Sequence, residues 1–141
     1  MKTNHLMIVA LSLLLMQLAG CSSETVQLSG KVVFSDDGAP VPIGTVCFTD
    51  GTVASRGTIL EDGTFTMGYV RMEDGIPPGR YKVYFIGVEL PDPAKDQAAM
   101  DNTSPLIDRK YTRSDTSGLE VEITADTKTM EFKLDRFRSG R

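Results

Sequence analysis

The stretch RYKVYFIGVEL, residues 80–90, is the longest and most apolar strand candidate in the sequence. Its side chains alternate in direction with the two-residue period of a β-strand. One face would carry Tyr81, Val83 and Phe85, and the other Tyr84, Ile86 and Val88. Because both faces are apolar, we expect this strand to be central in its sheet and covered on both sides.

Six further segments alternate apolar and polar residues and are separated by turn residues, which predicts strands. They are residues 26–34, 43–49, 53–60, 64–71, 119–124 and 129–134. Asp-Gly pairs at 50–51 and 62–63 predict hairpin turns between neighbouring strands. The runs 119–124 and 129–134 alternate cleanly, and we expect them to be antiparallel partners with one solvated face.

About seven short strands without a helical period predict an all-β fold, an antiparallel β-sandwich with Greek-key connections. The exception is residues 91–118, a long polar crossover loop with three prolines. Loops of this length are usually functional or disordered. Residues 94–100 could form a short helical turn. We expect Leu106, Ile107 and Tyr111 to hold the loop against the outer face of the 80–90 strand.

The N-terminal segment has the layout of a secretory signal. Lys2 lies in a short polar start, residues 6–18 are almost wholly apolar, and small residues follow. The apolar run is shorter than the roughly 20 residues of a membrane-spanning helix. A signal peptide is therefore favoured over a transmembrane helix.

The sequence Leu18-Ala19-Gly20-Cys21 resembles the lipobox of bacterial lipoproteins. The resemblance implies that the Cys21 thiol receives a diacylglyceryl group and that residues 1–20 are then removed. Ser22 stands where many Gram-negative lipoproteins retained in the inner membrane have Asp, which favours the outer membrane. Lipid chains at Cys21 would anchor the protein stably at a membrane. An ordinary secreted protein and an anchor that keeps its helix remain as alternatives.

These signals divide the chain into four parts. Residues 1–20 are the signal peptide and 21–25 a short lipidated tether; residues 26–135 are the sandwich domain, and 136–141 a short basic tail. The 121 residues left after cleavage suit one domain. Oligomeric state is left open.

The composition of the processed chain excludes several function classes. Removal of Lys2 leaves 14 of the 15 Lys and Arg residues against 19 Asp and Glu residues. The processed chain thus has a net charge of −5, which is the wrong sign for binding the phosphates of nucleic acid. His5, the single histidine, lies in the removed segment, so a Ser-His-Asp or Cys-His site is absent. Cys47 has no partner for an internal disulfide and is expected to pack as a small strand residue.

The region 26–90 resembles the carboxypeptidase regulatory-like, or transthyretin-like, domain. The matching motifs are Gly30-Lys31-Val32-Val33-Phe34, Asp37-Gly38-Ala39-Pro40-Val41, Asp62-Gly63-Thr64-Phe65 and Pro78-Gly79-Arg80-Tyr81-Lys82-Val83. The resemblance implies a transthyretin-like sandwich and supplies no catalytic residues. Turn geometry and core packing also explain each motif on their own.

We therefore expect a non-catalytic lipoprotein of the cell envelope that acts as a binding or structural module, without cofactor or metal. The long loop, with Leu106, Ile107 and Tyr111, is the candidate contact surface for an envelope protein or a glycan. One alternative is a small-ligand domain. It would bind calcium through Asp36, Asp37, Asp62, Asp92 or Asp96, or carbohydrate with Tyr111 as a stacking platform. A hydrolase is less favoured: transthyretin-like hydroxyisourate hydrolases use histidines, and only the tail Phe137-Arg138-Ser139-Gly140-Arg141 is similar to their terminal Tyr-Arg-Gly-Ser motif.

Overall fold

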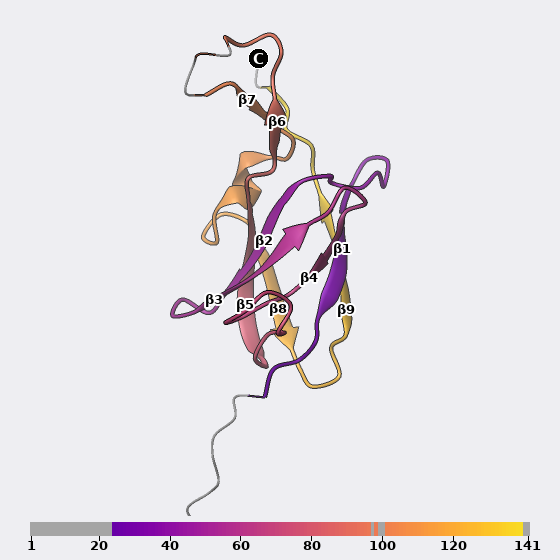
Figure 1. Cartoon of the computed structure of the whole chain (residues 1–141), viewed down its shortest axis with the longest axis vertical. Coiled ribbons are helices and arrows are strands. Elements are labelled where there is room, and N and C mark those ends of the chain that lie inside the picture. Colours follow the sequence, from indigo (N-terminus) through magenta and orange to yellow (C-terminus); the bar gives the residue numbers. More distant parts are fainter. Residues whose placement is uncertain (1–23, 97, 99–100, 140–141) are drawn as a thin grey trace, which may run out of the picture.

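The protein is an all-β sandwich of two sheets with a small two-stranded ribbon at one end (Figure 1). The computed structural model describes residues 24–96, 98 and 101–139. The three-stranded sheet has the order β4-β1-β9, the four-stranded sheet β3-β2-β5-β8, and the ribbon pairs β6 with β7. The strands are β1 (Ser29–Phe34), β2 (Gly44–Thr49), β3 (Ala54–Ile59), β4 (Thr64–Thr66), β5 (Gly79–Ile86), β6 (Glu89–Pro91), β7 (Thr103–Pro105), β8 (Leu119–Ile123) and β9 (Thr129–Leu134). The 3-10 helix η2 (Arg109–Thr112) precedes β8. The predicted fold class is confirmed.

The core forms because alternate residues of both sheets are apolar and point inward. Phe132 of β9 lies at its centre, with its ring centroid 6.0 Å from that of Phe48, 6.2 Å from Phe65 and 5.7 Å from Phe85. These four rings come from both sheets. Their edge-to-face and stacked contacts therefore join the two sheets directly.

Gly30 in β1 shows why a small residue is needed at one inward position. A Cβ atom there would collide with the Phe65 ring and the Met130 carbonyl oxygen. The glycine therefore leaves room for the Phe65 ring beside the β1 backbone. This explains the glycine of the Gly30-Lys31-Val32 segment.

Strand β5 is the longest strand and lies between β2 and β8, as predicted. Tyr81, Val83 and Phe85 are buried in the core. The predicted cover over its other face is only partial: Val88, just beyond the end of the strand, is buried, whereas Tyr84 is half-buried and Ile86 is 41% exposed. The outer face of the four-stranded sheet is thus partly open to solvent.

One predicted strand pairing is also wrong. Strands β8 and β9 are not partners: β8 pairs with β5 and β9 pairs with β1, so they lie in different sheets. The β1–β9 pairing is moreover parallel, which is feasible because the whole intervening chain serves as the crossover. The alternating pattern correctly identified β8 and β9 but contained no information on their partners, and the strand predicted at 64–71 ends at Thr66.

The two Asp-Gly turns behave differently. Asp50-Gly51 joins β2 to β3 in an antiparallel hairpin, as predicted. After Asp62-Gly63 the chain instead changes sheets, and β4 pairs with β1. The Leu60 amide donates to the Thr64 carbonyl at 2.9 Å, and the Arg56–Gly68 bridge keeps β3 beside the end of this segment, so the second turn is a splayed hairpin that connects the sheets.

The crossover at 91–118 is more ordered than the sequence predicted. Its first half forms the β6–β7 ribbon, which begins at Glu89, and its second half contains η2. The described residues of 94–100 form turns and bends and no helix. Ile107 and Tyr111 are buried in the core at the end of the sandwich, and η2 contacts β5, but Ile86 on the outer face of β5 stays 41% exposed.

The strand directions give the sandwich two distinct ends (Figure 1). The chain enters at the end that contains Glu24, the β2–β3 turn, residues 67–78 and the β8–β9 turn; we call this the N-terminal end. The β6–β7 ribbon, η2 and the last described residues lie at the opposite, distal end. The two ends are therefore separated by the length of the strands.

Candidate functional site

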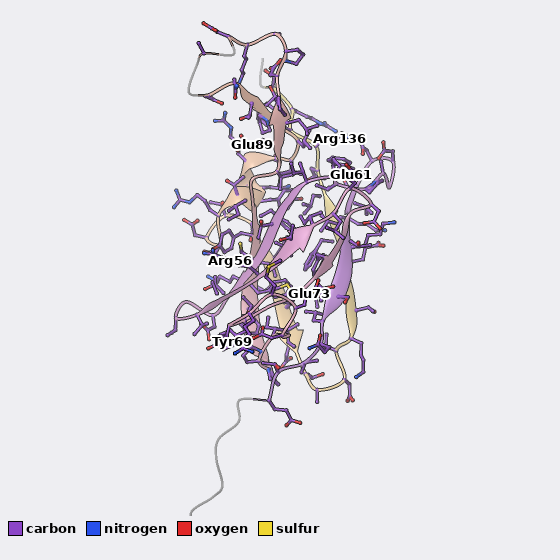
Figure 2. All side chains as sticks on the ribbon, in the orientation of Figure 1. Arg56, Glu61, Tyr69, Glu73, Glu89 and Arg136 are labelled. Carbon is purple, nitrogen blue, oxygen red and sulfur yellow. The ribbon has the colours of Figure 1, made fainter. Side chains whose placement is uncertain are left out.

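The ribbon formed by β6 and β7, here called the distal ribbon, projects beyond the sandwich (Figure 1). Ser104 donates a hydrogen bond to the Asp92 carboxylate at 2.6 Å, and the Thr103 hydroxyl contacts the Glu89 carboxylate. Figure 2 shows Glu89 at the base of this ribbon. Leu90 is 40% exposed there. The distal ribbon is thus a hydrogen-bonded element with an exposed apolar side chain.

The residues that follow the ribbon anchor the crossover to the domain. Ile107 and Tyr111 are 1% and 6% exposed, and Leu106 is half-buried. The backbone amide of Phe137 donates to the Leu106 carbonyl at 3.0 Å. Of the three loop residues singled out in the sequence, two therefore belong to the core. The prediction that Tyr111 is free for ligand stacking is wrong.

Asp135 organises a polar cluster at this end. Its carboxylate accepts hydrogen bonds from Ser35 Oγ at 2.7 Å, Lys110 Nζ at 2.7 Å and Tyr111 Oη at 3.0 Å. The Lys110 hydrogen bond is the largest cause that lowers the pKa of Asp135 to about 2, followed by those from Ser35 and Tyr111. The same contact raises the pKa of Lys110 well above its usual range. The cluster joins the turn after β1, η2 and the segment after β9.

Arg136 ties the C-terminal segment to the turn after β1. Its guanidinium lies 3.6 Å from the centroid of the Phe34 ring, 3.0 Å from an Asp36 carboxylate oxygen and 2.8 Å from one of Asp37. Arg109 similarly lies over the Phe137 ring. Residues 136 and 137, expected to begin a short basic tail, are thus packed on the domain. Arg136 is labelled in Figure 2.

A groove of about 500 Å³ lies on the outer face of the four-stranded sheet near its N-terminal end. Its floor carries Arg80 and Lys82 of β5 opposite Glu122 and Glu120 of β8. Gly51 and Ser114 contribute to its lining from two loops. Arg80 Nε is 3.7 Å from Glu122 Oε1, with both side chains largely exposed. Charges of both signs therefore line this open groove.

Cys47 lies on the same outer face and is fully buried. Its cross-strand neighbours are Arg56 of β3 and Tyr84 of β5. Burial raises the pKa of the Cys47 thiol. The side chain is packed in a strand, as predicted, although on the outer side of the sheet. The thiol is therefore shielded from solvent.

The carboxylates proposed as calcium ligands accept hydrogen bonds from backbone amides of the turns in which they lie. Asp37 accepts from the Ala39 amide at 2.9 Å, and Asp62 accepts from the Thr64 amide at 3.0 Å. The Ala39 amide lowers the pKa of Asp37, and the hydrogen bond from the Thr64 hydroxyl, followed by that from the Thr64 amide, lowers the pKa of Asp62. Across the residues that the structure describes, no group of three or more His, Cys, Asp or Glu side chains is placed to hold a metal.

Cys21, the predicted lipidation site, and the apolar run 6–18 lie outside the described residues. Within residues 24–96, 98 and 101–139, no helix is long and apolar enough to span a membrane. The anchoring of the chain therefore stays a prediction from the sequence. The lipobox resemblance supports it.

Sequence reasoning missed the groove and the Asp135 cluster. Both depend on residues brought together from distant segments, such as Ser35 and Asp135 or Lys82 and Glu120. The one local signal was the Asp135-Arg136 pair directly after a strand. Its partners follow only from the parallel pairing of β1 with β9.

No family model and no curated protein matches this chain. Among solved structures the chain is similar to a variant of BcpA, the major pilin subunit of Bacillus cereus, with 14% identity and a TM-score of 0.48. The match covers 81% of this chain but 30% of the pilin chain, so this chain spans less than a third of that subunit. Similarity this remote transfers neither a fold family nor a function. The resemblance to carboxypeptidase regulatory-like domains stays a prediction.

Proposed function

We propose that this protein is a non-catalytic lipoprotein of the bacterial cell envelope, in which lipid on Cys21 holds the sandwich at a membrane. In this proposal the distal ribbon contacts an envelope protein or a glycan, and the outer membrane is the favoured location. One observation carries the proposal: the chain enters at the N-terminal end, and the ribbon projects from the opposite end (Figure 1). A lipid on Cys21 would thus leave the ribbon directed away from the membrane.

The non-catalytic part is supported by the environment of the titratable groups. The carboxylates with lowered pKa values, such as Asp50 and Asp135, accept hydrogen bonds from turn amides or from neighbouring side chains. The Cys47 thiol is buried with a raised pKa. These pKa shifts are caused by hydrogen bonds that hold turns and side chains in place, or by burial. Such causes favour a structural role for these groups over acid-base or nucleophilic chemistry.

The experiment is site-specific photocrosslinking in the producing cell. A photoreactive amino acid is introduced at Leu90 in the distal ribbon and, as matched control, at Arg80 in the groove of the full chain. We expect a discrete adduct from position 90 and none from position 80. Adducts from neither position, or the same adducts from both, would contradict the assigned contact surface.

A second variant tests the ribbon without disturbing the core. Residues 92–102 are replaced by Asn-Gly, which can close the strand ends at Pro91 and Thr103 as a two-residue hairpin. Residues 106–111 are kept, because removal of buried Ile107 would destabilise the domain. We expect the variant to fold and reach the membrane but to lose the adduct formed from position 90.

The groove favours a second candidate function, the binding of a polar small ligand such as a carbohydrate. Its facing cations and carboxylates, together with Thr49 and Ser114, offer donors and acceptors in an open cavity. The double variant Glu120→Gln/Glu122→Gln removes the two β8 carboxylates of the groove and tests whether they bind the ligand. Calorimetric binding of a glycan by the parent protein, lost in this variant, would favour the groove over the ribbon.

A further inference from the structure

The loop of residues 69–74, here called the N-terminal-end loop, exposes two large apolar side chains. Val70 is 77% exposed and Met72 is 85% exposed, more than any other large hydrophobic side chain among the described residues. The two residues also line a shallow hollow of about 250 Å³ with Ala54 and Arg56 of β3. Exposed apolar side chains placed together often mark a contact with a membrane or another protein.

The loop is held in one conformation by its own backbone contacts. The Asp74 carboxylate accepts hydrogen bonds from the backbone amides of Tyr69 at 2.5 Å, Val70 at 3.1 Å and Arg71 at 2.9 Å. Gly68 lies directly against the Arg71 carbonyl, where no Cβ atom would fit. Three amides of the loop are therefore already paired, which lowers the cost of placing it in a poorly hydrated interface.

The loop lies beside the point where the N-terminal segment joins the domain. Val26 and Ile76 exchange two backbone hydrogen bonds of 2.8 and 3.0 Å, and Gly75 packs against the Val26 carbonyl. Figure 2 shows Tyr69 toward this end of the sandwich. Cys21 and Glu24 are three residues apart, a covalent reach of about 11 Å at most. A lipid on Cys21 would therefore keep this end of the domain at the bilayer surface.

We propose that the N-terminal-end loop rests on the bilayer, with the Val70 and Met72 side chains inserted at the boundary between headgroups and acyl chains. This inference rests on the proposed function, because the lipid on Cys21 brings the loop to the surface. The loop adds a second contact beside the tether. Two contacts fix the orientation of the sandwich, and the distal ribbon then points away from the membrane.

The charges at this end decide which kind of lipid the loop requires. Arg71 is the only cation within the loop, and carboxylates outnumber cations on the segments around it. The acidic groups there are Glu24, Asp50, Glu73, Asp74, Glu122 and Asp126, and the basic groups are Arg56, Arg71, Arg80 and Lys128. Attraction to anionic lipid is thus not the driving force. We expect insertion into zwitterionic phosphatidylcholine, with little dependence on salt.

The experiment uses the absence of tryptophan from the sequence. Met72→Trp places one indole in the loop, and Leu60→Trp places one at a 57% exposed position beside Glu61, near the distal end (Figure 2). Each full-length variant is produced in a lipoprotein-processing host, purified and reconstituted into vesicles of phosphatidylcholine with brominated acyl chains. Brominated lipid quenches indoles that enter the acyl region. Anchoring is measured separately, as the Cys21-dependent recovery of the chain in the membrane fraction.

We expect strong quenching and a blue-shifted emission from M72W, and neither from L60W. Adding Val70→Asp to M72W should abolish most of the quenching, because a carboxylate is costly to bury. A Cys21-anchored M72W protein without quenching would overturn the inference while the proposed tether stands. If the chain proves not to be anchored through Cys21, the secreted M72W protein is mixed with the same vesicles. Quenching there supports the loop contact on its own, and its absence overturns it.

Discussion

At the residue scale, Phe132 joins the two sheets through contacts with three other aromatic rings. Phe132→Ala should lower the free energy of unfolding by about 3–5 kcal/mol, because the cavity would lie at the centre of the core. Urea denaturation monitored by circular dichroism measures this loss. The matched variant Phe137→Ala removes a half-buried ring at the edge and should cost clearly less. Equal losses would contradict the central position of Phe132.

The lowered pKa of Asp135 predicts that the stability of the fold depends on pH. The pKa of Asp135 is about 2 in the folded protein against an ordinary value of 3.8. A lowered folded pKa means that the carboxylate stabilises the fold above pH 4 and loses this contribution as pH falls toward 2. Thermal unfolding of wild type and Asp135→Asn should therefore differ most above pH 4 and converge toward pH 2. A difference that stays constant over this range would show that the cluster does not titrate as proposed.

At the element scale, Asp74 orders the N-terminal-end loop by accepting three backbone hydrogen bonds. Asp74→Ala should speed hydrogen exchange of the amides at residues 69–71, because they lose their acceptor. Exchange in the core strands should change little. Asp62→Ala, which uncaps a turn at the other end, serves as the control and should leave residues 69–71 protected. Unchanged exchange in Asp74→Ala would contradict the proposed rigidity of the loop.

The elements also show what the sequence could and could not predict. Strand β5 and the inward set Tyr81, Val83 and Phe85 were predictable, because burial imposes a two-residue period on the sequence. The pairing partners of β8 and β9 could not be predicted. The two-residue period indicates which face of a strand is buried, but it carries no information about the neighbouring strand. Ile107 and Tyr111 were recognised as anchoring residues but assigned to the wrong surface. Their location depends on the path of the crossover around the end of the sandwich.

At the scale of the whole molecule, the fold separates two exposed regions. The N-terminal-end loop lies beside the N-terminal segment, and the distal ribbon lies beyond the other end of the strands (Figure 1). If Cys21 carries a lipid, as the lipobox resemblance implies, the N-terminal end faces the membrane and the distal end points away from it. The position of the groove follows only from the β2-β5-β8 pairing, which no local motif encodes. Its role as a ligand site is therefore a question for binding experiments.

Metabolic labelling of the full chain with a clickable fatty acid in a lipoprotein-processing bacterium decides whether Cys21 carries a lipid. Wild type is compared with Cys21→Ala and with Cys47→Ala, which removes the buried cysteine instead. We predict that wild type and Cys47→Ala carry the label and sediment with membranes, whereas Cys21→Ala does neither. Unlabelled wild-type protein, or a Cys21→Ala variant that still carries the label and sediments with membranes, would contradict the proposed lipid anchor at Cys21.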